Sequence, residues 1–117
     1  MNRIELGRWG EEAAAHYLLK KRYLIVQRNV SFKHGEIDLI MLDGETLVFV
    51  EVKTRRQLTY GTPAEAVNRK KQQKLRELAI TYLQQQDKFY SNFRFDVCAV
   101  LYSSDKPVVI QHIPHAF

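Results

Sequence analysis

Hydrophobic residues recur at helical spacing in two stretches of the chain. From Ile4 to about Lys21 this spacing predicts an amphipathic helix, with apolar residues at Leu6, Trp9, Ala13, Tyr17 and Leu18. A second helix is predicted to start at Thr62-Pro63-Ala64-Glu65, which combines a threonine N-cap, a proline at the first helical position and a glutamate at the third. It runs to about Gln85, and its core face carries Ala64, Val67, Leu75, Leu78 and Tyr82.

Strands are predicted from runs that are rich in β-branched and aromatic residues. These runs are Tyr23–Val30, Glu36–Leu42, Thr46–Thr54, Phe93–Tyr102 and Val108–Ile113. The second and third are joined by Asp43-Gly44-Glu45, a sequence typical of a tight hairpin turn. The order α-β-β-β-α-β-β predicts a mixed sheet flanked by helices, of the α/β class, because the long second helix is a natural crossover between parallel strands. Residues 1–117 are expected to form a single domain, since single cores are commonly built from about 100–150 residues.

The third predicted strand carries charged residues within an otherwise apolar run. Side chains alternate along a strand, so Glu51 and Lys53 share one face with Leu47 and Phe49, while three valines share the other. If the hairpin turns at Gly44-Glu45, Asp38 lies directly opposite Glu51. If it turns at Asp43-Gly44, Asp38 lies one diagonal away on the same face. Both registers bring the two carboxylates close together.

Two neighbouring carboxylates repel each other unless a positive charge lies between them, and Mg²⁺ or Mn²⁺ meets that need with oxygen ligands. A metal-bound water can attack a phosphodiester, and Lys53 can orient that water or neutralise the developing charge. The alternative is a surface charge cluster on an exposed strand face. The position of Glu51 and Lys53 inside an apolar strand favours a site, because burying charges without a partner is costly.

Composition limits the classes of protein to consider. Hydrophobic residues make up 45% and charged residues 26%, as in globular domains. The net charge of +5 favours an anionic partner such as nucleic acid. The single cysteine, Cys98, excludes an internal disulfide. No signal peptide or membrane span is predicted, so a cytoplasmic location and no membrane partner are expected.

Several motifs resemble one family. Gly35-Glu36-Ile37-Asp38-Leu39-Ile40 and Val48-Phe49-Val50-Glu51-Val52-Lys53-Thr54-Arg55 resemble the YraN family of bacterial proteins. The resemblance extends to Gly7-Arg8-Trp9-Gly10-Glu11, Tyr60-Gly61-Thr62-Pro63, Lys71-Gln72 and Arg94-Phe95-Asp96-Val97. That family belongs to the restriction-endonuclease-like superfamily with the PD-(D/E)XK pattern and is similar to archaeal Holliday junction resolvases.

The resemblance implies a role for each matching residue. Asp38 and Glu51 would be metal-binding acids, Glu11 an additional acid near the metal, and Lys53 the lysine of the E-x-K element. Glu36 is a weaker candidate on the face of Asp38. The sequence departs from the superfamily pattern at Ile37, which stands where a proline is usual.

Other polar residues divide between contact with phosphate and ordinary structural roles. Arg55 and Lys71 are predicted to contact nucleic acid, because Arg55 extends the E-x-K strand and the resemblance puts Lys71 beside the site. The basic side chains of Arg69, Lys70, Lys74 and Arg76 are interpreted as solvated helix surface. Asp96 is interpreted as the acceptor for a buried donor, either an arginine or a backbone amide. The four histidines lack the spacing of a zinc site.

Three hypotheses follow from these residues. The first is a structure-selective DNA endonuclease that uses Mg²⁺ or Mn²⁺ and acts on branched or single-stranded features. The second is a nucleic-acid-binding module of the same fold that does not cleave. The third is a scaffold whose charges serve an oligomer interface. The sequence leaves the choice of DNA or RNA and the oligomeric state open, a homodimer included.

Overall fold

The computed structural model describes residues 1–56, 67–103 and 108–117. In these residues a mixed sheet has strand order β1-β2-β3-β4-β5, with β3 and β4 parallel and the other neighbours antiparallel. The elements are α1 (Arg3–Lys20), β1 (Leu24–Phe32), β2 (Gly35–Asp43), β3 (Thr46–Arg55), α2 (Arg69–Gln84), β4 (Asn92–Leu101) and β5 (Val109–Ile113). The predicted class and the order α-β-β-β-α-β-β are confirmed. None of the helices in the described residues is long and apolar enough to cross a membrane.

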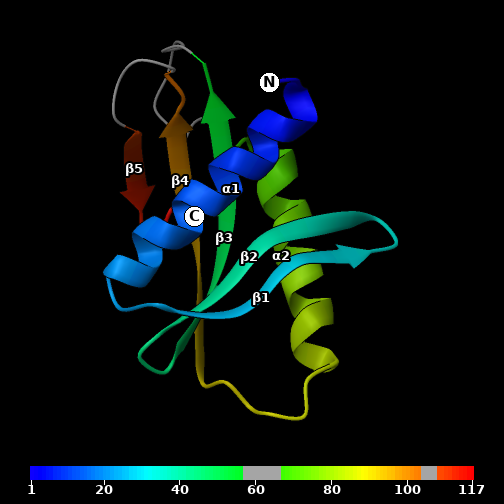
Figure 1. Ribbon diagram of the computed structural model, residues 1–117. Helices are drawn as coiled ribbons and strands as arrows, with labels where there is room; N and C mark the ends of the chain where they lie inside the picture. Colours follow the sequence, from blue (N-terminus) through cyan, green and yellow to red (C-terminus); the bar gives the residue numbers. More distant parts are fainter. Residues whose placement is uncertain (57–66, 104–107) are drawn as a thin grey trace.

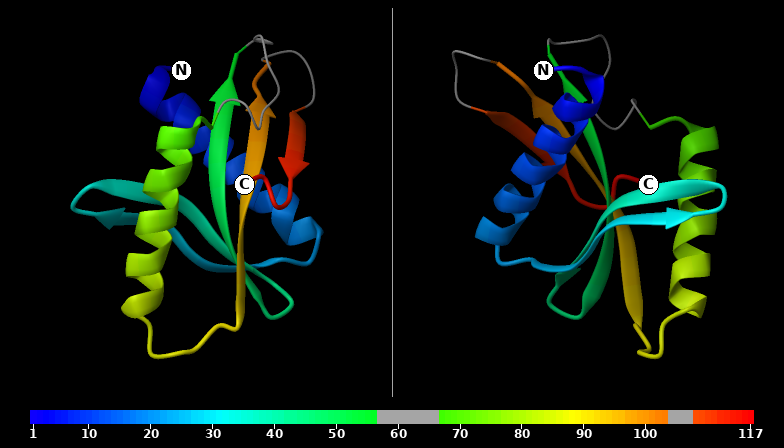
Figure 2. Two further views of the ribbon diagram at one scale, coloured as in Figure 1. Left: turned by 180° about the vertical axis from the view of Figure 1, so that it is seen from behind. Right: turned by 45° about the vertical axis from the view of Figure 1, so that its right-hand side comes forward.

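The two helices lie on opposite faces of the sheet (Figures 1 and 2). Strand alternation in β3 explains this arrangement, because Val48 and Val50 pack with the α1 core while Leu47 and Phe49 pack with the α2 core. The α1 core includes Ala14, Ala15 and Leu18, and the α2 core includes Leu75, Leu78 and Tyr82. Each face of the central strand therefore has its own helix.

The hairpin between β2 and β3 turns at Gly44-Glu45. Asp43 pairs with Thr46, and the ladder continues to Leu39 opposite Val50. Gly44 has a φ of +61°, a conformation that glycine adopts without steric cost. Of the two predicted registers, the structure has the one that directs Asp38 towards Glu51.

The β1–β2 hairpin bends away from the sheet and its far end passes over α2 (Figure 2). Its register shifts between Ile25 and Gln27, which is a β-bulge that increases the local twist. Ile37 consequently packs in the α2 core, although Leu39 on the same strand packs in the α1 core. This bend separates the start of β2 from β3 and leaves room for polar side chains at the point of separation.

The second helix differs from its prediction. It begins at Arg69, and Asn68 caps it with an extended backbone and a side chain that accepts from the Lys71 N–H at 2.9 Å. The predicted start at Thr62-Pro63-Ala64-Glu65 lies outside the described residues. One uninterrupted helix from there to Gln85 was nevertheless wrong, because the non-helical Asn68 interrupts it. Val67 is buried in the core from a position before the helix.

Candidate functional site

Asp38 lies where β2 leaves β3. One position beyond the last pair of the ladder, its Oδ2 accepts a hydrogen bond from the backbone N–H of Val52 at 2.9 Å. The side chain thus accepts from an N–H of β3 beyond the last β2–β3 backbone pair. This bond fixes a carboxylate at the point where the two strands separate.

Glu51 is the second acid of the site, in the middle of the sheet and only 6% exposed. Its carboxyl lies within hydrogen-bonding reach of Asp38. Its Oε2 atom has no hydrogen-bond partner among the described residues. The cation beside that atom is Lys71, whose Nζ is 3.4 Å away, so the ion pair lacks hydrogen-bond geometry. A buried carboxylate oxygen in this state is under-coordinated.

The pKa of Asp38 is raised to about 8. Burial is the largest cause, followed by the hydrogen bond to Glu51 and by its charge. The Val52 N–H and the Lys71 ammonium act in the opposite direction. The protein therefore stabilises a proton, or another positive charge, between these acids at neutral pH.

Two further acids approach Asp38. Ligand oxygens of Glu11, Glu36 and Asp38 all lie within 4.8 Å of one another, an arrangement able to hold a metal ion. Burial, then the charges of Asp38 and Glu36, raise the pKa of Glu11 to about 7, while Arg8 lowers it. Asp38 therefore belongs to two acidic groups, one with Glu51 and one with Glu11 and Glu36.

A close approach of α1 to β3 brings Glu11 to this position. A Cβ on Gly10 would lie 1.7 Å from the Thr54 Oγ1, so only glycine allows the helix to cross the strand here. The next residue along α1 is Glu11. The contact between Gly10 and the Thr54 side chain therefore sets the location of this acid.

Asn29 is a residue of the site that the sequence did not reveal. With its amide nitrogen turned towards the acids, it donates to Glu11 Oε1 at 2.8 Å and to Glu36 Oε1 at 3.0 Å. Its φ of 50° is a left-handed conformation that asparagine tolerates better than most residues. The signal in the sequence was weak, because the bulge in β1 sets the β1–β2 register and so decides which residues of β1 lie near the acids of β2.

A pocket of ≈ 230 Å³ lies beside Glu11. Its lining is Arg8, Glu11, Glu12, Arg28, Asn29 and Leu39. Arg28 is held by Glu12 at 2.6 Å. The acidic group therefore borders a hollow that also carries positive charge.

The predicted basic residues differ in how close they come to the acids. Lys71, the third residue of α2, reaches Glu51 as described above. Lys53 is half-buried, and strand alternation gives it the face of Glu51. Arg55 is exposed at the end of β3. The structure thus brings Asp38, Glu51 and Lys71 together, with Lys53 one strand repeat away.

The donor set fits a hard divalent cation. Mg²⁺ prefers carboxylate oxygens and retains several waters, so it needs one or two carboxylates rather than a full protein cage. The Oε2 of Glu51, which lies beside Asp38 and has no hydrogen bond among the described residues, is the kind of ligand that such an ion takes. Glu11 and Glu36 offer further oxygens within 4.8 Å of an oxygen of Asp38, in a group that does not include Glu51.

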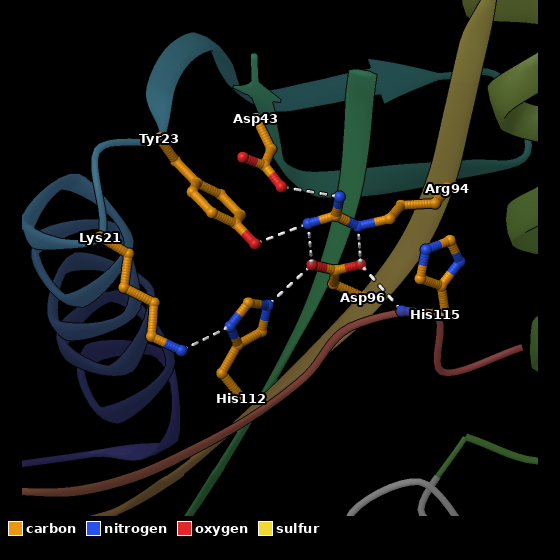
Figure 3. Close-up of polar contacts among 7 residues, drawn as sticks. All are labelled: Lys21, Tyr23, Asp43, Arg94, Asp96, His112 and His115. Carbon is orange, nitrogen blue, oxygen red and sulfur yellow. Dashed lines mark hydrogen bonds and ion pairs between the residues drawn. The ribbon is translucent and has the colours of Figure 1, made fainter. Parts of the chain in front are cut away.

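A second buried polar cluster, around Asp96 on the α1 side, is fully bonded (Figure 3). Asp96 accepts from Arg94 Nε at 2.9 Å, from His112 Nε2 at 2.7 Å and from the His115 N–H at 3.2 Å. Arg94 also donates to Tyr23 and pairs with Asp43. Asp96 accepts from buried donors, the arginine and a backbone amide among them, which confirms the prediction. His112 was not anticipated, because only the β4–β5 register brings it here.

Comparison with known proteins places this chain among bacterial relatives. The model of a family described as "Uncharacterised protein family UPF0102" matches residues 10–100. A "UPF0102 protein" of Syntrophomonas wolfei is 47% identical over 117 residues, covering 100% of both chains. One of Rhodococcus opacus is 46% identical over 114 residues, covering 97% of each. One of Caldicellulosiruptor saccharolyticus is 44% identical over 118 residues, covering 100% of both.

Proposed function

The chain belongs to the UPF0102 (YraN) family, and for this member we propose the activity of a metal-dependent, structure-selective DNA endonuclease. The observation that supports the proposal most directly is the buried Glu51 oxygen next to Asp38; this oxygen has no hydrogen bond among the described residues, although the Lys71 ammonium lies 3.4 Å away. A buried pair of carboxylates with so few hydrogen-bond donors is energetically favourable only if a cation binds to it. Hydrolysis of a phosphodiester is the reaction that such a cation and a nearby lysine serve best.

In this proposal each residue of the site has a defined task. Asp38 and Glu51 hold Mg²⁺ or Mn²⁺, and Glu11 adds a third carboxylate. When bound, the ion supplies Lewis-acid stabilisation of charge on a phosphate oxygen. Lys53 orients the attacking water and stabilises negative charge that develops on the phosphate oxygens. Arg55, exposed beyond Lys53 on the same strand, contacts the phosphate backbone of the DNA, and the net charge of +5 favours its approach.

A cleavage screen tests this proposal. The protein is incubated with branched, flapped and single-stranded DNA, with Mg²⁺ or Mn²⁺ titrated from zero. We expect metal-dependent cleavage of at least one branched or single-stranded substrate. We expect the rate to fall about 100-fold or more in Glu51→Gln and Lys53→Ala, since loss of one group that stabilises transition-state charge commonly costs this much. Lys20→Ala, at the far end of α1, is the matched control and should cleave as the wild type does.

Two results would refute the nuclease. One is no cleavage of any substrate at any metal concentration. The other is equal cleavage by wild type, Glu51→Gln and Lys53→Ala, which would identify a contaminant.

The ion pair between Lys71 and Glu51 favours a second candidate, a nucleic-acid-binding module without cleavage. In that case the lysine would be the permanent partner of Glu51 and no metal would be required. DNA binding would weaken steeply with salt. It would be the same in wild type and Asp38→Ala, with or without Mg²⁺.

A further inference from the structure

Lys71 has an unusual contact for a surface lysine. Its side chain is 38% exposed, yet the ammonium approaches Oε2 of the buried Glu51 at 3.4 Å. The same ammonium lowers the pKa of Asp38, so its field reaches both acids. The oxygen still has no hydrogen bond among the described residues. Lys71 thus neutralises part of the charge without satisfying the oxygen that it faces.

Lys71 lies in the first turn of its helix, where the helix dipole disfavours a positive charge. Arg69, Lys70 and Lys71 fill the first turn of α2, which has no acidic residue. The N-terminus of a helix carries partial positive charge and disfavours cations there. Asn68 fixes the backbone of Lys71 through its N–H, which directs this one of the three side chains to the site. Attraction to the acids of β2 and β3 offsets the unfavourable interaction of this lysine with the helix dipole.

We propose that Lys71 is a displaceable counter-charge for Glu51. Its ammonium moves away from the Glu51 carboxylate when a divalent cation binds between Asp38 and Glu51. The inference rests on the cation site of the proposed function. Both positive charges would use the same Oε2 atom, and like charges at such short range repel strongly in a partly buried site. A metal ion satisfies the oxygen better, because it forms a direct coordination bond with it.

The released ammonium remains at the edge of the site. The lysine stem is long and flexible, and its partial exposure gives it space to move towards solvent. There it meets the phosphate groups of a nucleic acid approaching the metal. Metal binding would therefore convert Lys71 from a partner of Glu51 into a phosphate contact, so that the protein grips DNA more strongly with metal than without it.

Calorimetric titration with Mn²⁺ alone, without nucleic acid, tests the displacement. We expect Lys71→Met to bind Mn²⁺ about tenfold more tightly than wild type, equivalent to about 1.4 kcal/mol, because the competing charge is gone. Lys70→Met removes the same charge from the same turn and is the matched control. It should bind within about twofold of wild type, since an exposed charge without a site partner has a screened effect. Equal or weaker binding by Lys71→Met would overturn the proposal.

A second measurement follows the wild-type chain and needs a variant only to assign one signal. Lysines are dimethylated with ¹³C-formaldehyde, and the Lys71 signal is assigned by its loss in Lys71→Arg. We expect this signal to move on addition of Mg²⁺ towards the position of the solvated lysines. A Lys71 signal that stays in place while the cation binds would overturn the inference.

The two proposals can fail separately. Tighter Mn²⁺ binding by Lys71→Met, in a protein that cuts no DNA, would support the displacement and refute the nuclease. Cleavage that depends on Glu51, with no gain in Mn²⁺ affinity in Lys71→Met, would do the reverse. Absence of Mn²⁺ binding in every variant would overturn the displacement together with the metal of the nuclease.

Discussion

Replacement of Asp96 by alanine should destabilise the fold more than any other single loss of charge in the described residues. Asp96 is 0% exposed and accepts from Arg94, His112 and the backbone of His115. The alanine variant leaves the Arg94 guanidinium, whose side chain is 10% exposed, without its main acceptor. Breaking a buried pair by removing one partner costs about 3–5 kcal/mol.

Asp43→Ala supplies the matched control. Asp43 binds the same arginine at 2.8 Å, but its side chain is 44% exposed. Pairs with a solvated partner are worth about 0–1 kcal/mol. The difference between the two variants should therefore be about 2–5 kcal/mol, a large part of the 5–15 kcal/mol that holds a typical domain folded.

Urea unfolding measures both variants, with Trp9 fluorescence and circular dichroism as independent probes. Equal losses of unfolding free energy in Asp96→Ala and Asp43→Ala would contradict the assignment of the network as a core element. The pH dependence gives a second check. The hydrogen bonds from His112 and Arg94 hold the pKa of Asp96 below its ordinary value despite burial. Its contribution is therefore complete above the unfolded value of about 3.9 and is lost as the pH falls through the lower folded value, so wild type and variant should converge in acid.

Two further predictions concern the glycines of α1 and the acids Glu11 and Asp38. Gly10→Ala should lower the free energy of unfolding by about 1–3 kcal/mol, because its Cβ would overlap Thr54, whereas Gly7→Ala, with nothing within 4 Å, should raise it by up to about 1 kcal/mol; thermal melts compare the two. In metal-free protein, the raised pKa values of Glu11 and Asp38 mean that the folded state binds more protons than the unfolded state, so stability should fall as the pH rises from about 4 through 7 to 8. Mg²⁺ should restore the melting temperature more at pH 8 than at pH 6, because the acids must be deprotonated to bind it, and an equal increase at both pH values would contradict this account.

Local patterns were sufficient to predict most of the fold. The Asp-Gly pair and the alternation on both sides of it predicted the hairpin between β2 and β3, and the observed turn is one of the two expected. The same alternation predicted that Glu51 would share a face with Phe49. These features depend on a few adjacent residues, so the sequence contains all the information that they need.

Features that depend on distant contacts were not predictable in this way. The bulge between Ile25 and Gln27 and the bend of β2 before Leu39 are not signalled by neighbouring residues, and together they bring Asn29 and Glu36 to the acids. His112 meets Asp96 only through the β4–β5 register. The spacing of residues along one element does not indicate such long-range contacts.

Asp96 and the Asp38–Glu51 pair belong to the same sheet but differ in how fully their carboxylates are bonded. Asp96 has donors for both of its oxygens, and its pKa is lowered, as expected of a carboxylate with a purely structural role. Asp38 lies beside the under-coordinated Glu51, and its pKa is raised to about 8. The protein therefore provides hydrogen-bond donors for both oxygens of Asp96, but leaves an oxygen of the Asp38–Glu51 pair without one among the described residues. Since burying such a pair is unfavourable, its presence is explained if a cation completes it.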